Sequence, residues 1–152
     1  IVFRCNFQVL LISIIGMPFI ASAQDDKLCE HLISFASKSK VGKPLKVKLI
    51  NDLANFSKSC EHNETEEGKE FCNYLIKNTS TEFMDINLSR VLSCSVNDFN
   101  LGSVHLNKIS GEFSVFETPR LNQYITLNIN FSIGDDVIKD FIEIEAENEP
   151  EE

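Results

Sequence analysis

Residues 121–131 read Leu-Asn-Gln-Tyr-Ile-Thr-Leu-Asn-Ile-Asn-Phe, and this stretch carries the clearest secondary-structure signal in the sequence. From Ile125 to Phe131, apolar side chains alternate with threonine and asparagine. A period of two residues is typical of an antiparallel strand with one buried face and one face in water. The stretch therefore predicts a half-buried strand in the C-terminal half of the chain.

Shorter stretches on either side predict about four strands in total between residues 100 and 144. The strands are marked by apolar residues at Val104 and Leu106, at Phe113 and Val115, within residues 121–131, and at Ile138, Ile142 and Ile144. Gly111 and the Gly-Asp-Asp segment 134–136 predict two of the turns that connect these strands.

The N-terminal half has an apolar period near 3.6 residues, which predicts about four helices. Their apolar stripes are Leu28-Leu32-Phe35-Ala36, Val47-Ile50-Leu53-Ala54, Phe71-Leu75-Ile76 and Met84-Leu88-Val91-Leu92. The first two helices are expected over residues 25–39 and 44–60, and the pairs Asn63–Glu66 and Thr79–Glu82 are expected to cap the third and fourth. Helices followed by strands predict an α+β fold, with disulfide-stapled helices packed on one face of an antiparallel meander.

Residues 1–23 have the three features of an export signal in the expected order. Arg4 precedes an apolar segment over residues 7–15, and the Ala-Ser-Ala segment 21–23 offers small side chains to a signal peptidase. The apolar segment is shorter than the roughly 20 residues that a membrane anchor needs. We therefore expect a signal peptide over residues 1–23, a single domain over residues 24–144, an acidic disordered tail over residues 145–152, and a secreted or periplasmic location.

Four cysteines remain after residue 23, namely Cys29, Cys60, Cys72 and Cys94. An even number of cysteines in an exported chain predicts disulfides, because the compartment is oxidising. Four cysteines allow three pairings, and the sequence does not choose among them.

The pattern Cys-Glu-His occurs at residues 29–31 and again at residues 60–62, which raises the question of a zinc site. Residues two apart on a helix point in different directions, and cysteines in disulfides are not available as thiolate ligands. The three histidines, His31, His62 and His105, stand in no recognisable nucleophile motif. We therefore expect no metal, no cofactor and no catalytic residue.

The chain has 14 basic and 23 acidic residues, and without Arg4 the exported part has a formal net charge of −10. A surface of this charge repels nucleic acid and anionic membranes, so we expect neither as a partner. It attracts cations, so a basic protein is the expected partner. Tyr74, Glu143 and Glu145 are the residues that we expect to contact it, with Tyr74 as an aromatic anchor.

These features favour an exported binding protein, such as an inhibitor or immunity protein that acts on a cationic enzyme or toxin. The alternative is a small-ligand carrier or an enzyme with a cone-like fold, whose pocket lies between the helices and the sheet. A deep apolar cavity would favour the alternative. A filled core with an acidic, partly apolar surface would favour the binding protein.

Overall fold

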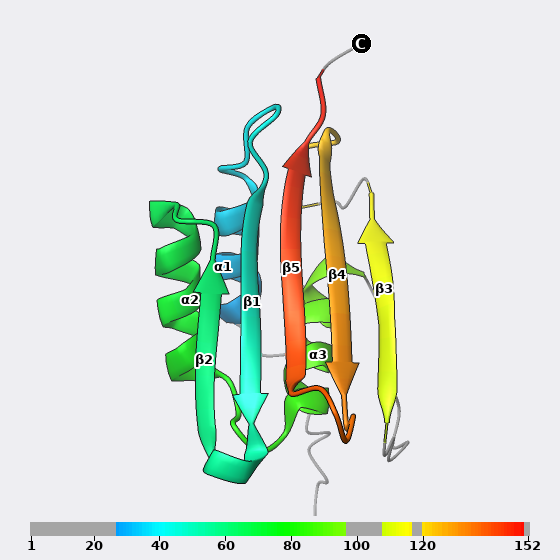
Figure 1. The fold of residues 1–152 in the computed structure, drawn as a ribbon. Helices are drawn as coiled ribbons and strands as arrows, with labels where there is room; N and C mark the ends of the chain where they lie inside the picture. The colour runs from blue at the N-terminus through cyan, green and yellow to red at the C-terminus, as the bar shows by residue number, and fades with distance from the viewer. Residues whose placement is uncertain (1–26, 97–107, 117–119, 151–152) are drawn as a thin grey trace, which may run out of the picture.

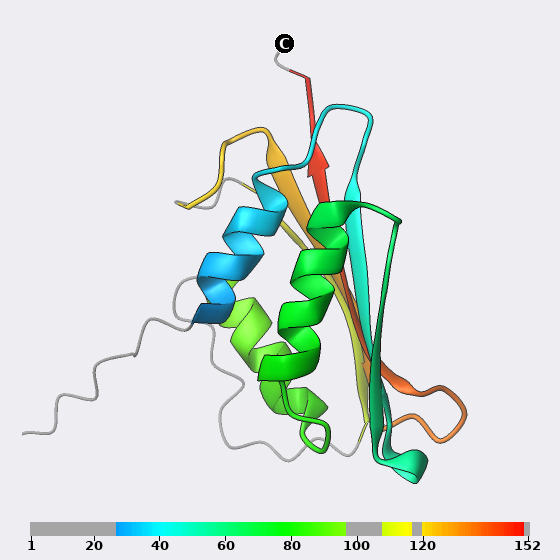
Figure 2. The same ribbon diagram turned by 90° about the vertical axis from the view of Figure 1, so that its left-hand side faces the viewer.

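The computed structural model describes residues 27–96, 108–116 and 120–150. Its elements are, in chain order, α1 (Lys27–Ala36), β1 (Leu45–Asp52), a 3-10 turn η1 (Leu53–Asn55), β2 (Ser57–His62), α2 (Glu66–Asn78), α3 (Met84–Ser95), β3 (Ile109–Val115), β4 (Ile125–Ile133) and β5 (Asp140–Asn148). The strands form one antiparallel sheet in the order β2-β1-β5-β4-β3, and the helices cover one of its faces (Figures 1 and 2). The predicted α+β class, with helices on one face of an antiparallel sheet, is confirmed.

The helix predicted over residues 44–60 is wrong, because this segment forms the β1–β2 hairpin. Leu45, Val47 and Leu49 are buried, while Lys46 and Lys48 between them are partly exposed. This alternation has the period of a strand, and it was obscured by Val47 and Ile50, which also fit a helical stripe. The described part of the chain therefore has three helices and five strands, and helices and strands are not segregated into two halves.

The other three predicted helices are present, but their N-terminal caps differ from the prediction. Thr65, not Asn63, caps α2 by accepting a hydrogen bond from the backbone N–H of Gly68. Phe83 precedes α3 without a side-chain cap, and the hydroxyl of Ser80 instead accepts from the backbone N–H groups of residues 82 and 83.

The strands of the C-terminal half agree with the sequence in part. Gly111 lies inside β3 and is not a turn, and a Cβ at this position would approach the Phe131 ring to 3.3 Å. Gly134 has the positive φ of 73° that the predicted turn requires. β5 continues to Asn148, so the predicted boundary of the acidic tail at residue 145 is corrected. The predicted signal peptide, the strand at Val104 and Leu106, and residues 151–152 lie outside the described residues.

The core lies between the sheet and the helical layer. Its centre is the pairing of β1 with β5, in which Val47 opposes Ile144 and Leu49 opposes Ile142, all four almost fully buried. α1, α2 and α3 cover these side chains, and the rings of Phe35 and Phe71 stack with their centroids 4.8 Å apart where α1 meets α2. Buried side chains thus occupy the space between helices and sheet in the described part of the chain.

The four cysteines form two disulfides, as predicted. Cys29 pairs with Cys94 and joins α1 to α3, and Cys60 pairs with Cys72 and joins β2 to α2. The first closes a loop over a sequence separation of 65 residues and the second over only 12. A longer loop loses more conformational entropy in the unfolded chain when it is closed.

We expect the double variant Cys29→Ala, Cys94→Ala to lose more stability than Cys60→Ala, Cys72→Ala. Chain entropy gives losses of about 4 and about 3 kcal/mol for loops of these lengths. Urea unfolding followed by circular dichroism measures both free energies. Equal losses, or a larger loss for the shorter loop, would contradict this account of how the disulfides stabilise the fold.

Candidate functional site

The face of the sheet opposite the helices is polar, and we call it the open face. It consists of the strand positions that point away from the helices, which alternate along each strand with the positions that point toward them. These positions are Ser57, Ser59 and Glu61 on β2; Lys46, Lys48, Ile50 and Asp52 on β1; Phe141, Glu143, Glu145 and Glu147 on β5; Thr126, Asn128, Asn130 and Ser132 on β4; and Ser110, Glu112 and Ser114 on β3. No described helix covers this face (Figure 2).

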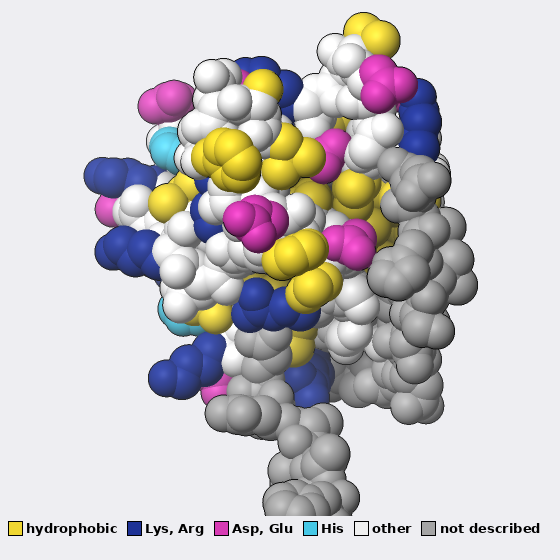
Figure 3. Space-filling model, turned by 90° about the horizontal axis from the view of Figure 1, so that it is seen from below, with side chains coloured by type: hydrophobic (Ala, Val, Ile, Leu, Met, Phe, Trp, Pro, Cys, Tyr) yellow, Lys and Arg dark blue, Asp and Glu magenta, His cyan; other side chains and the backbone are white. Residues whose placement is uncertain are grey.

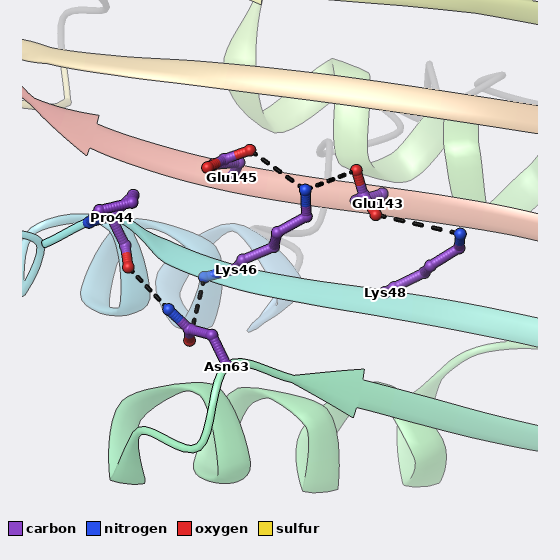
Figure 4. A network of polar contacts seen from close by, with 6 residues as sticks. All are labelled: Pro44, Lys46, Lys48, Asn63, Glu143 and Glu145. Atoms are coloured by element: carbon purple, nitrogen blue, oxygen red, sulfur yellow. Dashed lines mark hydrogen bonds and ion pairs between the residues drawn. The ribbon is translucent and has the colours of Figure 1, made fainter.

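Charged side chains of β1 and β5 form a ladder across the middle of the open face (Figure 4). The ammonium group of Lys46 lies 2.9 Å from a carboxylate oxygen of Glu143 and 3.3 Å from one of Glu145. Lys48 lies 4.0 Å from the other Glu143 oxygen, and its ammonium group also sits 4.1 Å from the centroid of the Phe141 ring. The ladder holds the two glutamates in a fixed orientation on the protein surface.

The hydrogen bond from Lys46 to Glu143 raises the pKa of Lys46, and the charges of Glu143 and Glu145 add to this effect. Partial burial acts in the opposite direction and does not cancel it. Lys46 is therefore a stable cation that neutralises part of the charge of its two partners. With Lys48 also paired to Glu143, the ladder holds two lysines and two glutamates and is formally neutral.

Asn63 ties the end of β2 to the start of β1 beside this ladder. Its Nδ2 donates to the carbonyl of Pro44 at 2.7 Å, and its Oδ1 accepts from the backbone N–H of Lys46 at 3.3 Å (Figure 4). A hollow of about 180 Å³ lies next to Asn63, with walls that include Lys46, Glu61 and Glu143. This volume is small compared with the roughly 300–1,000 Å³ of typical small-molecule pockets.

Acidic residues outnumber basic ones on the open face. The acidic residues are Asp52, Glu61, Glu112, Glu143, Glu145 and Glu147, and the basic residues are Lys46 and Lys48. The remaining positions on β3 and β4 are mostly serine, threonine and asparagine, and the Ser114 hydroxyl donates to Asn128 Oδ1 at 2.8 Å. The face therefore combines a charge-paired ladder and further carboxylates outside it, such as Glu61 and Glu147, with an area of neutral side chains rich in hydrogen-bond donors and acceptors.

The structure separates the three residues predicted to contact a partner. Glu143 and Glu145 lie side by side in the ladder on the open face. Tyr74 lies on α2 in the helical layer, where its ring stacks on that of His31 with centroids 3.8 Å apart. Tyr74 therefore does not share a surface with the two glutamates.

The sequence prediction missed Lys46, Lys48 and Asn63. The two lysines alternate with Leu45, Val47 and Leu49, and a strand interpretation of this segment would have placed both on a polar face. Nothing in the sequence indicates that they meet Glu143 and Glu145, because that contact depends on the register of two strands almost a hundred residues apart.

The cysteines and histidines of the two Cys-Glu-His patterns do not form a joint site. Cys29 and Cys60 belong to different disulfides, and His31 is engaged in the stack on Tyr74. Within residues 27–96, 108–116 and 120–150, no three His, Cys, Asp or Glu residues are grouped as metal ligands. His105 lies outside the described residues.

A larger hollow of about 410 Å³ opens at the surface beside the start of α2. The residues that line it include Lys38, Lys40, Lys43, Asn63 and Glu67. The Lys38 ammonium group is paired with Glu70 at 3.3 Å. Its lining comes from the start of α2, the start of β1 and the segment between α1 and β1, so the hollow opens at one end of the helical layer.

The chain matches no protein-family model, no curated protein and no solved structure. Among the described residues, no helix is both long enough and apolar enough to cross a membrane.

Two ion pairs fix the turns at the end of the sheet next to Asp52. Lys139 lies 2.7 Å from Asp52 and, with hydrogen bonds from Asn55, lowers the pKa of Asp52 to about 2. Lys108 lies 2.6 Å from Asp135 and, with backbone N–H donors of the turn, lowers the pKa of Asp135 to about 2. Both values lie below the usual 3.8 of an aspartate.

A carboxyl group whose pKa falls on folding stabilises the fold above its unfolded pKa, and this contribution is lost as the pH drops through the folded pKa. We therefore expect the free energy of unfolding to decrease between pH 4 and pH 2. In Lys139→Met, the carboxyl carbon of Asp52 should titrate closer to pH 3.8, as measured by NMR. Lys77→Met serves as the control and should leave this titration unchanged. An unchanged titration in Lys139→Met would show that Lys139 does not cause the shift.

Proposed function

We propose that this protein is an exported binding protein that engages a cationic protein through the open face of its sheet. The observation that carries the proposal is the excess of carboxylates on this face, held in place by the Lys46 ladder. An inhibitor or immunity protein that acts on a basic enzyme or toxin is the specific form that we favour.

The electrostatics of the open face support a basic partner. A surface with an excess of one charge accelerates encounter with a partner of opposite charge and fixes its orientation. Glu143 and Glu145 are preorganised by Lys46, so they lose little side-chain entropy when a partner binds. The neutral side chains of β4 and β3 offer hydrogen bonds next to these charges, as the rim of a protein interface does.

An exported location is part of the proposal. The two disulfides and the lack of a membrane-spanning helix among the described residues are compatible with an extracellular or periplasmic protein. Disulfides persist in such compartments and are rare in the reducing cytosol.

The alternative, a carrier or enzyme with a pocket between the helices and the sheet, has less support. In the described part of the chain, almost fully buried side chains occupy this space, among them Leu32, Leu75, Leu88, Ile129 and Ile144. The described hollows lie at the surface and are lined largely by charged and polar residues. A filled interior with an acidic surface is the arrangement that favours the binding protein.

Two variants of the full exported protein with the same change in net charge test the proposal. The open-face variant replaces three glutamates of β5 by Gln, namely Glu143, Glu145 and Glu147. The α2 variant replaces three glutamates of α2 by Gln, namely Glu66, Glu67 and Glu70. The unmodified protein, immobilised at low salt, should capture a basic protein from secreted or periplasmic extract and release it as the salt concentration is raised. The open-face variant should bind the captured protein at least about tenfold more weakly, whereas the α2 variant should bind it normally.

Equal weakening by both variants would show that net charge, and not the open face, attracts the partner. Binding that does not depend on salt would remove the electrostatic basis of the proposal. An empty eluate from the correctly disulfide-bonded protein would favour the small-ligand alternative.

A further inference from the structure

Exposed apolar side chains gather at the end of the molecule where the β1–β2 and β4–β5 turns and the start of α3 lie (Figures 1 and 2). They are Leu53 and Phe56 in the β1–β2 turn, Phe83 and Ile86 at the start of α3, and Val137 and Ile138 in the β4–β5 turn. We call these six residues the turn platform. Seen from this end, hydrophobic side chains spread over the surface with acidic and basic side chains among them (Figure 3).

The exposure of the turn platform is unusual for residues of this kind. Phe56 is 77% exposed and Val137 is 92% exposed. Single apolar residues on a surface need no explanation, but several large ones at one end of a domain are typical of an interaction site.

Polar contacts tie the three segments of the turn platform to one another. Asn51, at the end of β1, donates from Nδ2 to the carbonyl of Thr81 at 2.7 Å, just before Phe83. Lys58, at the start of β2, donates to the carbonyl and the hydroxyl of Thr79. These bonds join the β1–β2 turn to the α2–α3 connection.

The third segment is held by charge. Lys139, next to Ile138, pairs with Asp52 at 2.7 Å and so joins the β4–β5 turn to the β1–β2 turn. Within the β4–β5 turn, the carboxylate of Asp135 accepts from the backbone N–H of Val137 at 2.8 Å. The apolar side chains are thus presented on a framework that is formed before any partner binds, which lowers the entropic cost of binding.

The charges around the turn platform favour a basic occupant. Lys139 and Lys108, which border the β4–β5 turn, are already paired with Asp52 and Asp135. Glu82, Asp85 and Asp136 are exposed and form no ion pair among the described residues. The bases nearby are Lys77, Lys58 and Arg90, and the last two donate to the backbone carbonyls of Thr79 and Asn78. The three carboxylates, in contrast, are the direct sequence neighbours of Phe83, Ile86 and Val137, so the charges next to the apolar side chains are negative.

We propose that the turn platform binds the apolar side of a basic amphipathic segment of the partner protein. Apolar side chains of that segment contact Phe56, Phe83 and Val137, and its lysines or arginines face Glu82 and Asp85. The inference rests on the proposed function, because it names a second contact between this protein and its cationic partner.

The test uses the full exported protein and a labelled amphipathic peptide of leucine and lysine that is helical when bound. A peptide of the same composition in scrambled order is the reference, and fluorescence anisotropy measures both affinities. The amphipathic peptide should bind at least about tenfold more tightly than the scrambled one, because only the former presents a continuous apolar side.

Single variants on and off the turn platform distinguish it from apolar surface in general. Val137→Ser and Phe56→Ser should each weaken peptide binding about fivefold or more. Val41→Ser, at the opposite end of the molecule where Val41 is 56% exposed, should leave the affinity unchanged. Asp85→Asn combined with Glu82→Gln should weaken binding and reduce its dependence on salt.

Several results would overturn this proposal. The first is equal affinity for the amphipathic and the scrambled peptide. The second is a loss of peptide affinity in Val41→Ser as large as the loss in Val137→Ser. The third is no binding of either peptide. Binding to vesicles of zwitterionic phosphatidylcholine that is lost in Val137→Ser, without peptide binding, would assign the surface to membranes. Self-association lost in the same variant would assign it to a second copy of the chain.

The two proposals fail in different ways. If the open-face variant no longer binds the captured basic protein while Val137→Ser and Phe56→Ser bind it normally, the proposed function stands and the turn platform is not part of it. If no basic protein is captured, the proposed function fails whatever the peptide affinities are.

Discussion

The pairing of β1 with β5 determines both faces of the sheet at once. On the helical side, this register brings Val47 opposite Ile144 and Leu49 opposite Ile142. On the open side, it brings Lys46 opposite Glu145 and Lys48 opposite Glu143. A shift by one residue would turn the core residues to the water and the charged ladder into the core, so the hydrophobic pattern of these two strands fixes the position of the ladder.

The rest of the chain is arranged around this pair. The β1–β2 hairpin extends the sheet on one side and the β4–β3 hairpin on the other, while α1, α2 and α3 cover the apolar face. Both disulfides involve the helical layer, one between two helices and one between a helix and an edge strand. The open face carries neither, and its order derives from ion pairs and hydrogen bonds between strands.

Asp52 connects the two surfaces for which we propose a role. It is the last outward residue of β1 on the open face, and its pairing with Lys139 also holds the β4–β5 turn beside the β1–β2 turn. A partner that lies along β1 and β5 would therefore meet the apolar side chains of the turns at the end of the same strands. The open face supplies charge and hydrogen bonds, whereas the turns supply apolar contact area.

The sequence predicts the local elements better than their arrangement. β4 follows from the alternation between Ile125 and Phe131, and the three helices follow from their apolar stripes, because these patterns are long enough to distinguish the two periods. The β1–β2 hairpin was missed because Val47 and Ile50 fit a helical stripe as well as a strand. The disulfide pairing and the Lys46 ladder depend on contacts between residues distant in sequence, and no local pattern specifies such contacts.

The position of β5 also sets the order in which this fold can be completed. Among the described elements, β5 comes last in the sequence but lies in the middle of the sheet, with β1 on one side and β4 on the other. Until β5 has been synthesised, the two hairpins share no strand, and only the helical layer, through α2 on β1 and α3 on β4, links them. A chain that is still emerging from a ribosome therefore lacks its central strand, and the two hairpins become one sheet only when β5 is available.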